Sequence, residues 1–415
     1  MAIVAMTRTM ACSFLPLGVT RHLYETRVAA TLFILHGEDH SNPFDHSLTF
    51  DMRELHMRPR IVAILCVDAD PDRPEHGGAR YDCPDKLIWR QLPELASKIT
   101  SLRKDVLQRF GVKLRVTWFI RADSQIRQIH GDAAWCCREF RDLWNDLAQA
   151  GDELAWHPHA WRWSNPSRCW YNETVDTGYI LESYDLGFEA FGTEFGRSPA
   201  ASRVGINFHN DATMVKLDEL GVKVDLSGYP GLRLYYGRPE VGSPIPEGFD
   251  WRRTLPEAYH PARDDYQRPA EDGSLSILEI PITTWRRTPS SFDFWKGLLP
   301  LKIYDGAGYV RPAFKGWFIP NVWGAPNRFR LGISQVLSRA KRKGIAHYAS
   351  SMHPDDISEA NFLKLRGNLE YLIKATKEEA VNLSIATASQ AREDFTNYQF
   401  AANNSSTSSV QSPNF

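Results

Sequence analysis

The sequence predicts an α/β protein built on a parallel β-sheet, and three observations lead to that fold class. A helical period that closes at a glycine and is followed by an apolar strand recurs four times, which is the alternation of βα units. The first strand, Ile61–Asp68, is a nearly unbroken apolar run, as expected for a strand buried on both faces. The length of 415 residues suits one large α/β barrel with insertions.

The individual elements follow from where these periods begin and end. Helices are expected where apolar residues recur every three or four positions and stop at a glycine or another break. Their ranges are Asp85–Phe110, Ala133–Ala150, Thr174–Phe195, Asp211–Leu220, Gly332–Lys343, Ser358–Thr376 and a short helix ending at Phe395. Strands are expected at the short apolar runs between them. Their ranges are Ile61–Asp68, Leu114–Ile120, Glu153–Trp156, Ala200–Val204, Val222–Leu226, Leu275–Ile282, His347–Met352 and Leu383–Ala386.

Four regions interrupt this rhythm. Residues 1–58 show no clear period and are expected to form a partly disordered extension before a catalytic barrel at 59–396. Residues 227–273 and 283–329 are long and irregular, rich in Pro, Gly, Arg and aromatic residues, and are expected to be insertions that carry function. Residues 397–415 are rich in Asn, Ser and Thr and are expected to be disordered.

Composition argues against two classes of protein. Lys plus Arg number 49 and Asp plus Glu number 50, without the basic excess of nucleic-acid-binding proteins, so no nucleic acid partner is expected. No apolar run approaches the roughly 18 residues of a membrane helix, so no transmembrane segment is expected.

The six cysteines form no C-x-x-C pair, which indicates reduced thiols and a cytoplasmic location, either free or at the periphery of a membrane.

Three aspartates stand at alternate positions at the end of the first strand. Asp68, Asp70 and Asp72 share one face if the backbone stays extended. Three carboxylates on one face repel one another unless a cation or protons compensate their charge. A solvated acidic turn would explain the same residues, and this segment alone does not decide. Because ligands bind at the carboxyl ends of strands in open parallel sheets, we favour a functional cluster.

Two histidines stand at the carboxyl end of the third strand. His157 and His159 flank Pro158, and extended backbone places both imidazoles on one face, where they can bind one Zn²⁺. Two half-buried histidines bonded to the backbone are the alternative, which the H-x-H pattern alone would favour. The pair follows a strand of the same expected sheet as Asp68–Asp72, which favours the metal site.

Two further polar residues end strands. His353 is followed by Pro354 and two aspartates, and it either acts as a general acid or enters a helix capped by Asp356 or Ser358. Arg203 either binds a carboxylate or phosphate or lies at a hydrated end of the sheet.

Seven short blocks carry a resemblance to a known family. In chain order they are CVDADPD, VTWFI, GDELAWHPHAW, SRVGINFHNDATMVKLDELGVKVD, ILEIPIT, HYASSMHPDD and IATASQA. This ordered set resembles the motifs of the polysaccharide deacetylase family, also called the NodB-homology domain or carbohydrate esterase family four, in a divergent branch. The resemblance covers roughly residues 60–395. It implies a distorted (β/α) barrel of about seven parallel strands, with 227–273 and 283–329 as long loop insertions.

The resemblance also implies roles for individual residues. Asp68 matches the family's catalytic base, Arg203 the arginine that positions this base, and His353 the catalytic acid. His157 matches the first metal-binding histidine.

The chain departs from the family pattern at two metal ligands. Ala69 replaces the second of two adjacent aspartates, which leaves Asp70 as the carboxylate ligand. Trp161 stands where the family has its second histidine, four residues after His157, which leaves His159 as the ligand. The implied cofactor is a divalent metal, with Zn²⁺ expected first and cobalt, nickel or manganese as alternatives.

The activity that the resemblance implies is hydrolysis of the acetyl amide of an N-acetylated sugar or glycan, such as one made in surface-glycan biosynthesis. We expect Trp161, Asn207, Tyr259 and Trp285 to contact this carbohydrate. One alternative is another C–N hydrolase on the same fold, acting on a small cyclic amide or ureide. The other is a glycan-binding barrel without catalytic activity.

Overall fold

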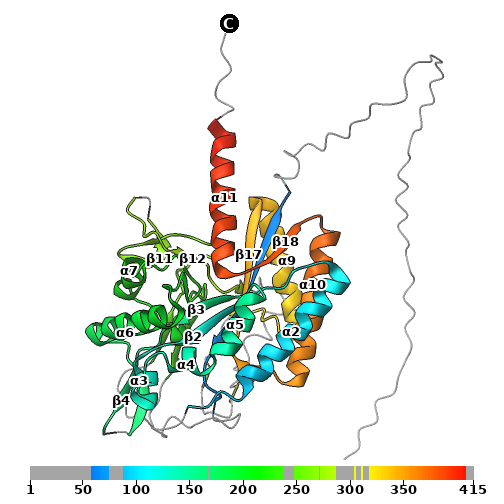
Figure 1. The fold of residues 1–415 in the computed structure, drawn as a ribbon. Coiled ribbons are helices and arrows are strands. Elements are labelled where there is room, and N and C mark those ends of the chain that lie inside the picture. The colour runs from blue at the N-terminus through cyan, green and yellow to red at the C-terminus, as the bar shows by residue number, and fades with distance from the viewer. Residues whose placement is uncertain are drawn as a thin grey trace, which may run out of the picture. The chain divides into compact units, whose positions relative to one another are not determined.

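Eight parallel strands form one curled sheet at the centre of the described chain (Figure 1). They are β1 (Arg60–Ala69), β2 (Thr117–Arg121), β3 (Glu153–His157), β6 (Ala201–Ser202), β7 (Val224–Asp225), β12 (Leu278–Glu279), β17 (Ile345–Met352) and β18 (Asn382–Ala386). Seven of them follow the order β12-β7-β6-β3-β2-β1-β17, and β18 pairs with β1. The predicted distorted barrel of about seven parallel strands is confirmed. This computed structural model describes residues 58–73, 87–166, 168–236, 247–270, 272–286, 303–304, 310–311 and 317–407.

The barrel is distorted at two places. On one edge, β1 pairs with β18 along residues 60–64 and with β2 along residues 66–69, so the sheet forks. Between β12 and β17 the barrel closes without a regular ladder. There Thr283 donates its backbone N–H to the carbonyl of Ala349 at 2.9 Å, and the Thr283 hydroxyl accepts from the Ala349 N–H.

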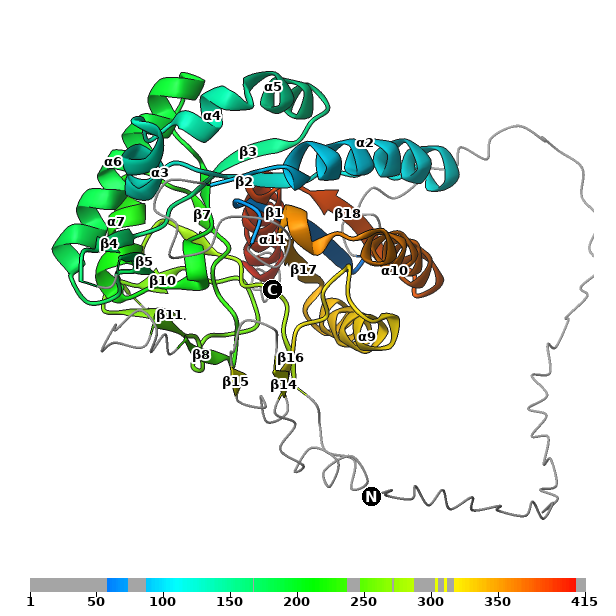
Figure 2. The same ribbon diagram turned by 90° about the horizontal axis from the view of Figure 1, so that it is seen from below.

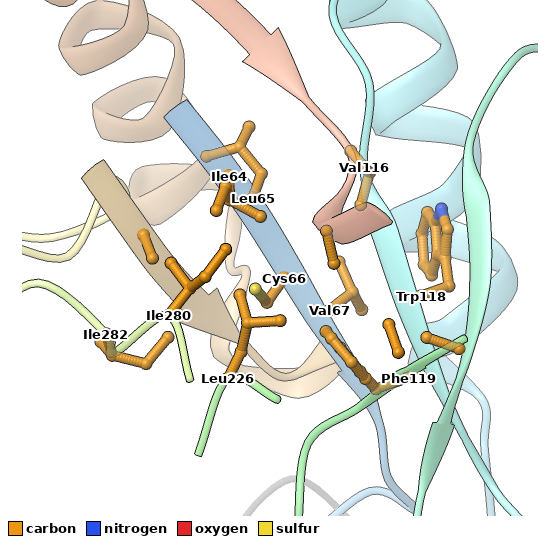
Figure 3. Packing of buried hydrophobic residues seen from close by; sticks show 14 of the residues in the cluster. Ile64, Leu65, Cys66, Val67, Val116, Trp118, Phe119, Leu226, Ile280 and Ile282 are labelled. Carbon is orange, nitrogen blue, oxygen red and sulfur yellow. The ribbon is translucent and has the colours of Figure 1, made fainter. Parts of the chain in front are cut away.

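Strand β1 lies in the middle of the core. Its residues from Ile61 to Val67 are fully buried, because parallel strands in a barrel have neighbours on both faces. Figure 3 shows four of these side chains among buried residues from other parts of the barrel. Ile64, Leu65, Cys66 and Val67 lie between Leu226, Ile280 and Ile282 on one side and Val116, Trp118 and Phe119 on the other. Burial of each large apolar side chain stabilises the fold by about 1.5–3 kcal/mol.

Helices lie around much of this sheet, and short strands of the insertions lie on the remaining side, as Figure 2 shows. They are α2 (Gln91–Phe110), α3 (Ser124–His130), α4 (Trp135–Glu139), α5 (Arg141–Gln149), α6 (Thr177–Phe195), α7 (Asp211–Glu219), α9 (Pro326–Lys343), α10 (Glu359–Glu378) and α11 (Ala388–Thr407). Helix α2 buries a stripe at the spacing that its sequence predicts, made of Leu92, Leu95, Ile99, Leu102 and Val106. None of the described helices combines the length and apolarity that crossing a membrane requires.

The helix expected at Ala133–Ala150 is two helices, and α3 before it was not expected. Phe140, with φ −106° and ψ 26°, interrupts the helix between α4 and α5, and its ring packs against Trp135 and Trp144. Tertiary packing therefore overrides the local helical period. Helix α3 begins where the Asp123 carboxylate accepts the N–H of Ile126, an N-cap that the sequence analysis did not use.

The two insertions contribute short antiparallel pairs. Within 227–273 these are β8 (Arg233–Tyr236) with β9 (Glu247–Asp250) and β10 (Pro261–Ala262) with β11 (Asp265–Pro269). Within 283–329 they are β13 (Trp285–Arg286) with β16 (Trp317–Phe318) and β14 (Ile303–Tyr304) with β15 (Val310–Arg311). An unexpected hairpin, β4 (Trp161–Ser164) with β5 (Cys169–Asn172), directly follows the two histidines.

Helix α11 extends beyond its expected end. The sequence predicts a helix that stops at Phe395 and disorder from residue 397, whereas α11 continues to Thr407. The Tyr398 hydroxyl donates to the carbonyl of Lys343 at 2.9 Å, which ties this part of the helix to the end of α9. The predicted disorder of residues 397–407 is therefore wrong. Residues 408–415 and the predicted extension at 1–57 lie outside the described residues.

Candidate active site

The carboxyl ends of five strands bring polar side chains to one end of the barrel, the end that Figure 2 faces. Asp68 lies near the end of β1, and Arg121 and His157 are the last residues of β2 and β3. Arg203 directly follows β6, and His353 directly follows β17. Because the strands are parallel and adjacent, residues that are far apart in the sequence meet at this edge.

Asp70, His157 and His159 form a compact triad. The Nε2 atoms of the two histidines lie 3.1 Å apart. One carboxylate oxygen of Asp70 lies 3.3 Å from Nε2 of His157, and the other lies 3.4 Å from Nε2 of His159. Among the described residues this is the one group of His, Cys, Asp and Glu side chains found close enough to hold a metal ion. Burial opposes ionisation of Asp70, but the two histidines hold its pKa well below the ordinary value.

The tautomer of His157 suits metal binding. Its Nδ1–H donates to the backbone carbonyl of Arg203. The lone pair of the neutral ring therefore lies on Nε2, the atom that faces Asp70 and His159. Two imidazole nitrogens and a carboxylate oxygen in this arrangement form a donor set typical of catalytic Zn²⁺ sites. The residues present therefore fit a divalent metal ion.

Asp68 lies deeper than Asp70 and is held by Arg203. The Nε of Arg203 lies 2.8 and 2.9 Å from the two oxygens of Asp68. The other guanidinium nitrogens donate to the carbonyl of Leu226 at 2.6 Å and to the hydroxyls of Tyr229 and Ser351 at 3.0 and 3.2 Å. The arginine is therefore fixed at several points, and it fixes one position of the buried Asp68 carboxylate.

His353 lies beside both aspartates and is the most exposed of these groups, with 34% of its side chain accessible. Its Nε2 lies 3.5 Å from an oxygen of Asp70 and 3.8 Å from an oxygen of Asp68. Its Nδ1–H donates to Asp356 at 3.2 Å, and Arg73 pairs with Asp356 from the other side. Burial would lower the pKa of His353, but the hydrogen bond to Asp356 and then that to Asp70 raise it well above the ordinary value.

Comparisons with known proteins give distant structural matches alone. No protein-family model and no curated protein matches the sequence. A protein from Mycobacterium smegmatis provisionally described as a polysaccharide deacetylase aligns at 15% identity and TM-score 0.44, over 82% of this chain and 92% of its own. A protein from Parabacteroides distasonis, provisionally described as a glycoside hydrolase/deacetylase, aligns at 14% identity and TM-score 0.46. This alignment covers 79% of this chain and 70% of that protein. An allantoinase aligns at 14% identity and TM-score 0.40, over 81% of this chain and 90% of its own.

Because the matches are distant, the fold described above rests on the strands and hydrogen bonds of this protein itself.

Arg121 is a site residue that the sequence analysis missed. It is 2% exposed, and its guanidinium contacts Asp70 at 3.1 Å, Gln125 at 2.9 Å and Asp123. The signal for it is a charged residue directly after the apolar run VTWFI, at the end of a strand that adjoins β1. Arg121 holds the Asp70 carboxylate through Oδ1, the same oxygen that lies 3.4 Å from Nε2 of His159.

Asp72 does not join the other two aspartates. Its carboxylate accepts the backbone N–H groups of Arg90 and Gln91 at 2.9 and 3.3 Å. These bonds place Asp72 at the amino end of α2, where a carboxylate is favourable. Because it is 4% exposed, Asp72 does not lie in a solvated turn. The alternation of Asp68, Asp70 and Asp72 thus serves two purposes, two carboxylates at the site and one at a helix start.

The expected carbohydrate contacts lie in different surroundings. Trp161 is stacked on His159, with ring centroids 5.7 Å apart, and the backbone carbonyl of Asn207 accepts the indole N–H of Trp251. Both belong to segments next to the triad. Tyr259 is buried and donates its hydroxyl to a backbone carbonyl, and Trp285 packs against Phe318. No described contact joins Tyr259 or Trp285 to the triad, so their role in substrate binding stays a prediction without support from these contacts.

Proposed function

We propose that this protein is a metal-dependent hydrolase that removes the acetyl group from an N-acetylated sugar or glycan by cleaving the amide C–N bond. The observation that carries this proposal is the convergence of the Asp70–His157–His159 triad with a carboxylate, Asp68, and an imidazole, His353. This constellation has the parts of an acid–base hydrolase.

Asp70, His157 and His159 would hold the divalent metal, of which Zn²⁺ fits the two imidazoles and one carboxylate best. Such an ion, when bound, polarises the amide carbonyl and promotes ionisation of water. Arg121 keeps Asp70 in place, and the Arg203 carbonyl keeps His157 in the required tautomer.

Two residues of the chain would move protons. Asp68, fixed by Arg203 and close to the triad, accepts the proton of the attacking water as a general base. His353, on the more exposed side, donates the proton to the amine that leaves when the C–N bond breaks. The products are acetate and a free amino sugar. Asp356 accepts the Nδ1–H of His353 and so orients the ring, with Nε2 facing Asp68 and Asp70.

Acetate release tests this proposal. Purified protein, supplied with Zn²⁺ or Co²⁺, is screened on N-acetylated monosaccharides, chito-oligosaccharides and nucleotide-linked N-acetyl sugars, with a cyclic ureide as an additional substrate. The expected result is acetate from at least one sugar and loss of release by about 10²–10⁴-fold in Asp68→Asn, the usual effect of removing a general base. Ring opening of the ureide without acetate release would favour the small cyclic amide instead. Sugar binding without turnover would indicate a glycan-binding barrel.

We propose a cytoplasmic location for the protein. Cys66, Cys136, Cys137 and Cys169 are free thiols and all four are buried. Cys136 and Cys137 are adjacent in sequence, and neither pairs with another described cysteine. Thiols of this kind are typical of a reducing compartment. Non-reducing mass spectrometry of protein from its native cells would detect a disulfide and so contradict this location.

A further inference from the structure

The ring of His159 lies against the α-carbon of Gly205. A β-carbon built at Gly205 would lie 2.1 Å from both Nδ1 and Cε1 of His159 and 2.3 Å from its Cγ. Real β-carbons do not approach other heavy atoms this closely. The imidazole therefore occupies the volume that any side chain at position 205 would need. Trp161 stacks on the same imidazole with an interplanar angle of 11°.

Gly205 cannot move away from the histidine without breaking backbone contacts. Its N–H donates to the carbonyl of Pro158 at 2.8 Å, and the N–H of Arg203 donates to the carbonyl of Trp156 at 3.1 Å. The segment 203–205 thus runs alongside the segment that carries the two histidines. The N–H of Val204 is bound in turn by the Ser227 hydroxyl at 2.8 Å.

The residues after Gly205 are held in an unfavourable backbone conformation. Ile206 and Asn207 have φ angles of 54° and 56°, in the left-handed region, where a β-branched residue such as Ile206 is strained. The hydrogen bond from Trp251 to the Asn207 carbonyl, 2.8 Å long, fixes this turn. Strain of this kind persists where the surroundings determine the path of the chain. Here the path brings the α-carbon of Gly205 against His159.

We propose that Gly205 is a positioning residue of the metal centre, and that its missing side chain lets His159, two residues after His157, serve as the second imidazole ligand. This inference rests on the proposed metal site and adds the reason why the short H-x-H spacing can work in this chain. Strand β3 ends at His157. Beyond Pro158, the His159 imidazole reaches Asp70 through the space that Gly205 leaves open. Trp161 then restricts the ring by stacking on it.

The test is metal affinity, measured by calorimetric titration of the metal-free full-length protein with Zn²⁺ and by the visible spectrum of bound Co²⁺. Gly205→Ala should weaken Zn²⁺ binding by about 10–100-fold, the usual effect of disturbing the residues behind a metal ligand. The matched control is Gly332→Ala in α9, where a β-carbon would lie 2.4 Å from Pro320. This variant should lose thermal stability but keep wild-type affinity for Zn²⁺. Equal affinity in Gly205→Ala and the wild type would overturn the inference.

A double-mutant cycle shows whether Gly205→Ala changes Zn²⁺ affinity through His159. It also keeps the inference testable if Gly205→Ala alone misfolds. In the His159→Ala background no ring occupies the space, so adding Gly205→Ala should cause no further loss of Zn²⁺ affinity. The double variant should also be more thermally stable than Gly205→Ala alone. An equal loss of affinity in both backgrounds would contradict the inference. If His159→Ala itself leaves Zn²⁺ binding unchanged, the proposed ligand set is wrong. If only His159→Ala weakens binding, the ligand set stands and the role of Gly205 falls.

Discussion

The Nε–H group of Arg203 is shared between both oxygens of Asp68, at 2.8 and 2.9 Å. The remaining guanidinium nitrogens donate to Leu226, which directly follows β7, to Tyr229 in the first insertion and to Ser351 in β17. Arg203 thus ties three parts of the barrel end to one carboxylate. The backbone carbonyl of the same residue accepts the ring Nδ1–H of His157, so a single residue connects the proposed base to the proposed metal centre.

Arg203→Lys should separate these two connections. The backbone contact with His157 remains, whereas an ammonium group cannot reproduce the planar set of donors that binds Asp68 and its three neighbours. We expect kcat for acetate release to fall by roughly 10²-fold, within the range that a general base contributes, with metal content unchanged.

Tyr229→Phe is the matched control for Arg203→Lys, because it removes one of the arginine's partners and leaves Asp68 bound. Its kcat should stay within a few-fold of the wild type. Wild-type kcat in Arg203→Lys would show that Asp68 does not need this arginine. A loss of metal from Arg203→Lys would instead assign the side chain to the metal centre.

Asp356→Asn should impair His353 specifically. An amide in place of the carboxylate is a weaker acceptor for Nδ1–H, so the ring is oriented less firmly. We expect kcat to fall about tenfold, part of the contribution of a general acid, while KM stays the same. Steady-state kinetics separates the two parameters.

Asp355→Asn provides the control for Asp356→Asn, since Asp355 also binds Arg73 but makes no described contact with His353. It should affect thermal stability more than kcat. If both variants lose the same activity, the contact with Arg73 rather than the orientation of His353 is what matters.

The sequence is sufficient to predict those strands and helices that have a clear local pattern of apolar residues. Strand β1 is a long apolar run and β17 lies between two expected helices, and their ends place Asp68, Asp70 and His353 at one edge of a parallel sheet before any contact is known. His157 follows by the same argument. The hairpin β4–β5 was missed because its two short strands mix aromatic and polar residues and form no apolar run.

The remaining parts of the site depend on neighbours across the sheet. Nothing in the local sequence shows that Arg121 would turn toward Asp70, or that Gly205 would lie against His159. Both contacts arise from the order of the strands and from a turn with positive φ angles. Helix α11 runs past its predicted end for a similar reason, because Tyr398 bonds to a residue 55 positions away.

Acid should destabilise the protein partly through His347. This histidine is 2% exposed, and burial, together with nearby Arg339, lowers its pKa from 6.5 to about 3. Between these pH values the unfolded chain binds a proton and the folded chain does not, so stability falls as the pH falls from 6.5 toward 3. His347→Gln should reduce this pH dependence by up to about 1.4 kcal/mol per pH unit.

Urea unfolding at pH 6.5, 5.5 and 4.5 measures the slope for His347→Gln and the wild type. The control is His260→Gln, which replaces a half-buried histidine that also bonds to a backbone carbonyl. Parallel stability curves for His347→Gln and the wild type would show that another group governs acid sensitivity.

Elemental analysis of freshly purified protein, comparing the wild type with His157→Ala, tests the central claim most directly. The triad at the barrel end predicts about one divalent ion for each wild-type chain and none in the variant. The variant should keep its circular dichroism spectrum, because His157 is the last residue of its strand and is not part of the hydrophobic core cluster. Wild-type protein without bound metal after incubation with Zn²⁺, or full occupancy in His157→Ala, would contradict the metal-dependent mechanism.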